Sequence, residues 1–125
     1  LFRSGGRTMN VHSLEQANQL MPYLQGITQK AASEVLVLAQ ERDLFEVDEP
    51  GYDDCVEKIQ GVIDIWVDQV DQAGAKPCGL WAVDFDKGDG YYSWKYPEPT
   101  LEYCRNDDPE KGAGKRELIQ PEIVH

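Results

Sequence analysis

The sequence predicts an α+β fold in which a long antiparallel helical hairpin is followed by a small three-stranded antiparallel β-meander. Two stretches place apolar residues at steps of three and four, a spacing that puts them on one face of an α-helix. Residues 79–103 hold seven of the chain's twelve aromatic side chains and alternate in polarity, which favours β-strands. Asp89-Gly90 within that segment is a hairpin signal, so the segment should fold back on itself.

The first predicted helix begins at Leu14 and ends near Arg42. Ser13 and Gln16 have the spacing of a capping box, in which the serine hydroxyl accepts a backbone amide and the glutamine side chain reaches back. Pro22 has no backbone N–H and its ring crowds the preceding turn, so we expect a short helix, a kink or restart, and then a long helix. The apolar stripe of the long helix consists of Leu24, Ile27, Ala31, Val35 and Leu38.

The second predicted helix has a cleaner apolar seam and ends at Ala73, with Gly74 as its C-cap. The seam consists of Val56, Ile59, Ile63, Trp66, Val70 and Ala73. Such alternating steps are typical of two helices that pack nearly antiparallel, so residues 14–73 should form a hairpin. The connection over residues 43–54 is acidic and contains Pro50-Gly51, which favours an exposed turn.

Three apolar residues of the second helix lie outside this seam and need another covering surface. They are Val62, Ile65 and Val67. The sheet should cover part of this surface. A second copy of the chain should cover the rest, because two hairpins form a four-helix bundle and symmetric dimers are the commonest oligomers. The sequence therefore predicts a homodimer that associates through its helices.

The β-meander is predicted over residues 79–105 and has three strands. The residues expected to share a face within each strand are Trp81, Val83 and Phe85, then Tyr92, Trp94 and Tyr96, and finally Leu101 and Tyr103. Residues 106–125 contain a polar, glycine-bearing stretch, and we interpret them as a loop and tail. Residues 1–8 lack periodicity, and we interpret them as an extension or cloning remnant before a single domain over residues 9–125.

The net charge makes nucleic acids and membranes poor partners for this protein. Twenty-three acidic residues outnumber twelve basic ones, and the resulting formal charge of -11 repels phosphate groups and anionic lipids. Ten of the acids lie between Asp43 and Asp71, where they form either a solvated face or a docking surface for a basic protein. Three cysteines without paired spacing favour a reducing compartment, so we expect a cytoplasmic protein.

No cofactor or metal ion is predicted from the motifs. Residues 84–90 resemble a calcium loop, but Gly88 and Asp89 stand where a ligand and the glycine of that loop belong, so we expect a hairpin turn. Residues 112–116 resemble a phosphate loop, but Arg116 replaces its hydroxyl residue. Zinc would require Cys78 and Cys104 to meet a histidine from near a chain end.

The sequence offers no catalytic residue, and we expect a non-enzymatic interaction module. Both histidines lie near the chain ends, so Ser-His-Asp or Cys-His catalysis has no base. The alternative is a ligand site or weak enzyme on the sheet. In it Asp84 and Glu98 would be acid–base groups, Trp94 and Tyr103 the walls, and Arg116 or Arg105 the anion-binding group. The two carboxylates would otherwise cap turns or form structural ion pairs with Arg105 or Arg116.

Several short motifs occur in a recognisable order over residues 11–118. They are Ser13, Ala17-Asn18, Leu20, Pro22, Gly79-Leu80, Val83-Asp84-Phe85, Trp94, Glu98-Pro99, Tyr103 and Arg116. This order resembles a family of small prokaryotic proteins classified as a domain of unknown function (family two-two-zero-three). The resemblance implies a helical pair followed by a sheet and implies no activity. The departures from the family pattern are His12 for an aromatic residue, Ser93 for cysteine, Pro97 for glycine and Cys104-Arg105 for a Trp-His pair.

Overall fold

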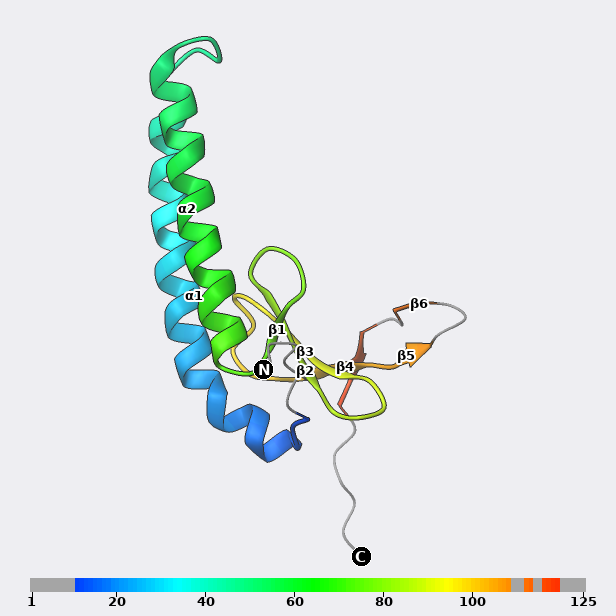
Figure 1. Ribbon diagram of the computed structural model, residues 1–125. Helices are drawn as coiled ribbons and strands as arrows, with labels where there is room; N and C mark the ends of the chain where they lie inside the picture. Colours follow the sequence, from blue (N-terminus) through cyan, green and yellow to red (C-terminus); the bar gives the residue numbers. More distant parts are fainter. Residues whose placement is uncertain (1–10, 109–111, 114–115, 120–125) are drawn as a thin grey trace, which may run out of the picture.

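A helical hairpin stands on a small antiparallel sheet in the computed structural model, which describes residues 11–108, 112–113 and 116–119 (Figure 1). Helices α1 (Leu14–Arg42) and α2 (Pro50–Gln72) run antiparallel and pack along each other. The sheet packs against the end of the hairpin that is farther from the α1–α2 turn. The predicted α+β class and the helical hairpin are therefore confirmed.

Helix α1 begins as its capping box predicts. The Ser13 hydroxyl accepts a hydrogen bond from the Gln16 amide at 3.1 Å, and the Gln16 side chain accepts one from the Ser13 amide at 2.9 Å. The predicted restart into a short and a long helix is wrong, because α1 continues through Pro22. The alternative, a kink, is present: the N-terminal part of α1 bends away from the axis of the rest (Figure 1). A proline inside a helix produces such a bend, since its ring displaces the preceding turn.

Helix α2 begins earlier than predicted, at Pro50. The predicted connection over residues 43–54 is thus shortened to the turn Asp43–Glu49. Proline suits the first helical position, because its missing N–H has no partner there in any helix. The Phe45 side chain lies over Gly51, where a Cβ atom would collide with the ring. Pro50-Gly51 therefore starts the second helix and does not form the turn itself.

The main sheet has five antiparallel strands in the order β1-β2-β3-β4-β7. The predicted meander corresponds to β2 (Ala82–Asp86), β3 (Tyr91–Lys95) and β4 (Tyr103–Arg105). Two further strands extend it at the edges, β1 (Lys76–Pro77) and β7 (Glu117–Leu118). Both are two residues long, too short for an alternating pattern to reveal them.

A second small sheet lies in the segment that we predicted to be a loop. It pairs β5 (Asp107–Asp108) with β6 (Gly112–Ala113). The loop prediction over residues 106–115 is therefore wrong at these four positions, and the tail prediction is wrong at β7. The predicted extension at residues 1–8 and the last residues of the chain lie outside the described residues.

Trp81 lies outside the strand in which its spacing placed it. Strand β2 starts one residue later, and Trp81 has a φ of 61°, which no strand residue adopts. Its ring packs edge-to-face on Trp66 of α2, with centroids 5.1 Å apart. The prediction that Trp81 shares a strand face with Val83 and Phe85 is wrong, although both of those residues are buried. Trp81 instead links the sheet to the helices.

The hydrophobic core lies between the sheet and the near halves of the two helices. Its buried members are Ala17, Met21, Leu24, Ala31, Trp66, Val70, Ala75, Val83, Phe85, Trp94 and Leu101. Within it, the Trp66 indole N–H donates a hydrogen bond of 2.8 Å to the hydroxyl of Thr28, which joins α2 to α1. Because this buried donor and acceptor satisfy each other, they fix how the two helices meet.

Candidate functional site

Three of the five predicted site residues lie in strands, and the two faces of the sheet separate Trp94 from Asp84 and Tyr103. Val83 pairs with Trp94 across β2 and β3, and both side chains are buried in the core beneath the helices. Asp84 pairs with Ser93, and Ser93 pairs with Tyr103, so these three residues share the opposite, open face. Trp94 therefore cannot form a wall of a site on the open face, so the prediction that it does is wrong.

Both predicted carboxylates form ion pairs with the two arginines named in the alternative interpretation. Asp84, only 1% exposed, pairs with Arg105, which also donates a hydrogen bond of 3.3 Å to the Cys78 sulfur. Glu98 accepts two hydrogen bonds from Arg116, at 2.7 and 2.9 Å. A buried carboxylate needs such a partner, because desolvation without one is costly. The open face thus carries two structural ion pairs.

Arg116 is held by four hydrogen bonds and a ring. Besides its two bonds to Glu98, it donates to the Ser93 hydroxyl and to the Ser93 carbonyl oxygen, both at 3.1 Å. Its guanidinium group lies over the Tyr103 ring, 4.1 Å from the centroid. A guanidinium has five N–H groups, so little of its donor capacity remains for a ligand. Arg116 serves chiefly to attach the segment before β7 to the sheet.

The protonation of this face does not suit acid–base or thiol catalysis. Burial of Glu98 favours its neutral form, but hydrogen bonds from Arg116 and from the Lys95 amide outweigh burial and lower its pKa. Burial, and next the Asp84 carboxylate, raise the pKa of the Cys78 thiol. Glu98 is therefore ionised and Cys78 protonated at neutral pH, so neither is prepared as a general acid or as a nucleophile.

A cavity of about 350 Å³ opens on the same face of the sheet. Its lining residues are Cys78, Gly79, Leu80, Ala82, Asp84, Ser93, Lys95, Arg105 and Arg116. The structure thus brings Asp84 and Arg116 together in one cavity, with Glu98 and Tyr103 behind Arg116. Ser93, Lys95 and Cys78 were not among the predicted site residues. Ser93 and Lys95 reach the cavity through the pairing of β3, and Cys78 lies in the turn between β1 and β2. Strand alternation on β3 was the available signal for Ser93 and Lys95.

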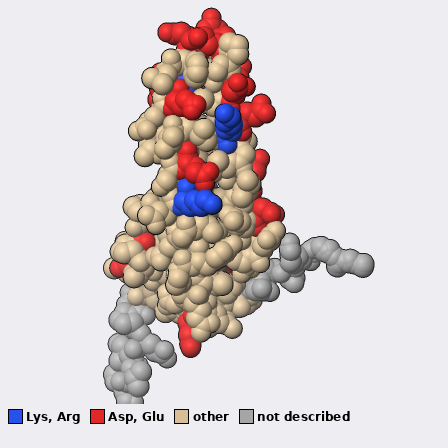
Figure 2. Space-filling view, turned by 90° about the vertical axis from the view of Figure 1, so that its left-hand side faces the viewer, with Lys and Arg blue, Asp and Glu red and all other residues tan. Residues whose placement is uncertain are grey.

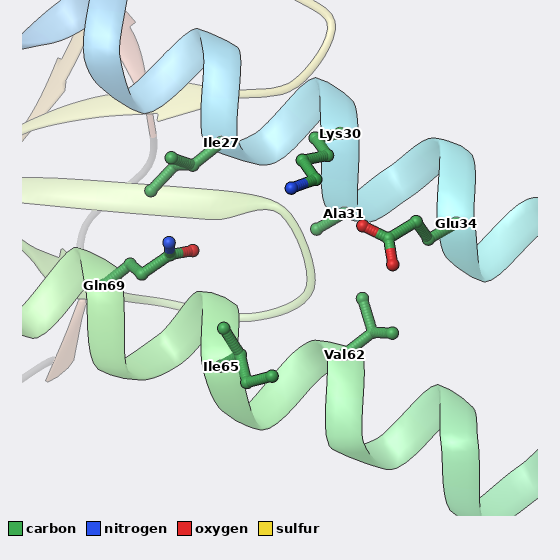
Figure 3. A pocket seen from close by; sticks show the side chains of 7 residues that line it. All are labelled: Ile27, Lys30, Ala31, Glu34, Val62, Ile65 and Gln69. Carbon is green, nitrogen blue, oxygen red and sulfur yellow. The ribbon is translucent and has the colours of Figure 1, made fainter.

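A second surface feature lies on the hairpin, on the side away from the sheet. A groove of about 290 Å³ runs between the helices, with Ile27, Lys30, Ala31 and Glu34 on α1 and Val62, Ile65 and Gln69 on α2. These side chains project towards the groove from both helices, with the sheet behind them (Figure 3). Figure 2 shows this side of the molecule, and its lower half carries few charged side chains. We call this surface the outer face.

The described residues give no sign of a metal centre or of a membrane span. No three His, Cys, Asp or Glu side chains in residues 11–108, 112–113 and 116–119 are placed to share a metal ion. Neither α1 nor α2 combines the length and apolar character that crossing a membrane requires.

Comparisons with known proteins add no relative to this picture. No protein-family model matches the chain, and no curated protein or solved structure shows significant similarity to it. The resemblance to the family of unknown function therefore stays a prediction from the motifs.

Proposed function

We propose that this protein is a non-enzymatic interaction module that forms a homodimer through the outer face of its helical hairpin. The observation that carries the proposal is Ile65, which is 64% exposed and lines the groove between the two helices. In the monomer the sheet covers only the opposite side of the helices. A second hairpin would supply the missing layer, since four helices bury the stripes that two leave open.

Charge arrangement on the outer face favours a second copy as its occupant. Lys30 and Glu34 lie one helical turn apart on α1 and line the same groove. In an antiparallel pair of α1 helices related by a two-fold axis near residue 32, each Lys30 would oppose Glu34 of the other copy. The chain as a whole carries a charge of -11, so two copies repel each other except where acids are few. The lower part of the outer face is such a region (Figure 2).

The size of the outer face suits a stable dimer. Helix α1 has 29 residues and is about 43 Å long at 1.5 Å per residue. Two helices, each about 10 Å wide, offer about 600 Å² in projection over 30 Å of that length. A typical specific interface buries about 800 Å² on each partner, which a convex helical surface of this projected size can provide.

The test is sedimentation velocity over a concentration series, with Ile65→Glu and a matched control. We expect the wild type to dimerise in the micromolar range and Ile65→Glu to weaken dimerisation at least about tenfold, because two carboxylates would be buried against each other. Leu118→Glu is the control, since Leu118 is 60% exposed and lies on the sheet edge. A wild type that stays monomeric at several hundred micromolar, or equal behaviour of the two variants, would refute the proposal.

The tip of the hairpin is a separate surface that we propose for a basic protein partner. Leu44 and Val47 are 83% and 72% exposed, and the acids Asp43, Glu46 and Asp48 lie between and beside them. An apolar contact ringed by lysines or arginines on the partner would complement this pattern. The double variant Leu44→Ser, Val47→Ser should leave the dimerisation constant unchanged, which separates the tip from the outer face.

We propose the cytoplasm as the compartment of this protein. All three cysteines, Cys55, Cys78 and Cys104, are free thiols. Reducing compartments keep thiols in this state, whereas secreted domains of this size commonly pair them.

A further inference from the structure

The cavity on the open face of the sheet has features of a binding site that the proposed dimer does not use. It lies on the sheet, whereas the outer face lies on the opposite side of the helices. Its volume of about 350 Å³ is at the lower end of the range for small-molecule sites. The residues that line it come from β2, β3, β4, the segment before β7 and the turn before β2, so only the folded chain creates it.

Arg105 is fixed in one orientation at this cavity. Its Nη2 group donates to Asp84 and to the Cys78 sulfur, and its guanidinium lies 5.2 Å from the Tyr91 ring centroid. Among the described residues, these bonds use only Nη2, which leaves the Nε and Nη1 groups of Arg105 as donors. A guanidinium held by a buried carboxylate loses little further side-chain freedom when it binds a ligand, and its Nε–H and Nη1–H groups can each donate one charge-assisted hydrogen bond to a carboxylate oxygen.

The charge balance of the cavity favours a monoanion. Arg105 is balanced by Asp84, and Arg116 is balanced by Glu98. Lys95 lines the cavity and forms no ion pair with any described residue, so one positive charge is in surplus. A ligand with a single negative charge would balance it, whereas a phosphate monoester would bring close to two.

The remaining wall of the cavity is apolar and belongs to the turn before β2. Leu80 is half-exposed at the cavity, next to Gly79 and close to Ala82. Gly79 and Trp81 on either side of Leu80 both have a positive φ, at 110° and 61°. Such a conformation is costly for tryptophan, and its packing on Trp66 holds it in place. The turn thus presents an apolar side chain beside the cationic groups.

We propose that this cavity binds a small monocarboxylate with a short apolar chain. Arg105 and Lys95 bind the carboxylate group, Ser93 lies at the floor of the cavity, and Leu80 covers the apolar chain. No covalent step is involved, because Cys78 is protonated and Asp84 is committed to Arg105. The protein would then be a sensor or carrier of such an acid.

The test is a titration of the full chain with hexanoate, followed by amide and arginine Nε–H shifts in ¹H–¹⁵N NMR spectra. We expect saturable shifts at Leu80, Ser93 and Arg105, with a dissociation constant in the millimolar range or below, as suits so small a ligand. Hexan-1-ol and hexylammonium, which lack the negative charge, should leave these signals unchanged.

Two lysine variants locate the site. Lys95→Gln should weaken hexanoate binding about fivefold or more, because it removes the surplus charge. Lys58→Gln, an exposed lysine on α2, is the matched control and should bind like the wild type. The proposal is overturned if hexanoate gives no saturable shift, if hexan-1-ol acts equally, or if both variants bind alike. Tighter binding of hexyl phosphate than of hexanoate would overturn the choice of a monocarboxylate. None of these outcomes bears on dimerisation.

Discussion

The two ends of the helical hairpin are built from similar sequence patterns but differ in what covers them. At the sheet end, Leu24, Thr28, Trp66 and Val70 are fully buried. At the end near the turn, Leu36 and Val37 are largely exposed and Val56 is 43% exposed. Among the described residues in the half of α2 nearer the turn, Cys55 is the one that is buried. Two helices bury only the stripes that face each other, so a third layer decides whether a stripe becomes a core.

This difference indicates how stability is distributed along the hairpin. The sheet end combines apolar burial, the Trp66–Thr28 hydrogen bond and the Trp66–Trp81 contact. The turn end has little besides helical hydrogen bonds and the facing stripe, which give marginal stability on their own. Opening of the turn end should therefore require less free energy than opening of the sheet end.

The largest contrast is expected between Trp66→Ala and Val56→Ala. Trp66→Ala should lower the free energy of unfolding by about 3–5 kcal/mol, because it leaves a core cavity and an unpaired Thr28 hydroxyl. Val56→Ala shortens a side chain that is 43% exposed and should cost less than about 1 kcal/mol. Urea unfolding at a concentration where the protein is monomeric measures both. Equal losses would contradict the contrast between the two ends.

A pair of glycine substitutions gives the next largest difference. Gly90 has a φ of 149°, and a Cβ there would lie 2.5 Å from the Arg105 carbonyl oxygen, so Gly90→Ala should cost about 2 kcal/mol or more. At Gly51 a Cβ meets only the Phe45 ring, which is free to swing outward, and alanine is the better helix former. Gly51→Ala should therefore change the free energy of unfolding by less than about 1 kcal/mol. Thermal unfolding of both variants distinguishes the two sites, and an equal loss at Gly51 would show that the turn is rigid.

The smallest expected effect concerns acid stability at the sheet end. The pKa of Glu98 in the folded protein lies below its ordinary value of 4.5. Such a carboxyl group stabilises the fold above pH 4.5 and loses that contribution as the pH falls through the folded-state pKa. Glu98→Gln should therefore show a smaller drop in urea midpoint from neutral to acid pH than the wild type.

The control variant for Glu98→Gln changes a residue in the half of α2 nearer the α1–α2 turn. Glu57→Gln removes the same charge from a residue that forms no ion pair with the described part of the chain. If Glu57→Gln reduced the drop as much as Glu98→Gln, the effect would come from net charge, and the Glu98–Arg116 pair would not explain it.

Local features of this protein were predictable from residue type and spacing. The capping box at Ser13, the apolar stripes of both helices and the turn near Asp89-Gly90 each involve residues close in sequence, and the structure contains all of them. The two-residue strands β1 and β7 and the position of Trp81 were not predictable, because each depends on a partner far along the chain.

The arrangement of the candidate site was still less predictable from the sequence than these parts of the fold. Asp84, Glu98, Tyr103 and Arg116 were named from their chemistry, but the register of β2, β3 and β4 placed Trp94 on the other side of the sheet. The same register brought Ser93, Lys95 and Arg105 to the cavity. A shift of one residue would exchange the two faces, and the side-chain pattern alone does not state which strands pair.

By itself, the sequence determined the helical hairpin, the strand-forming character of the aromatic segment and the acidity of the surface, because these follow from propensity, periodicity and charge. The tertiary structure decided which carboxylate meets which arginine, which half of the hairpin is covered and where a cavity opens. The physical reason is that helix caps and stripes are formed within a few residues. Burial and ion pairing arise only when distant segments come together, and their free energies depend on the desolvation that this arrangement produces.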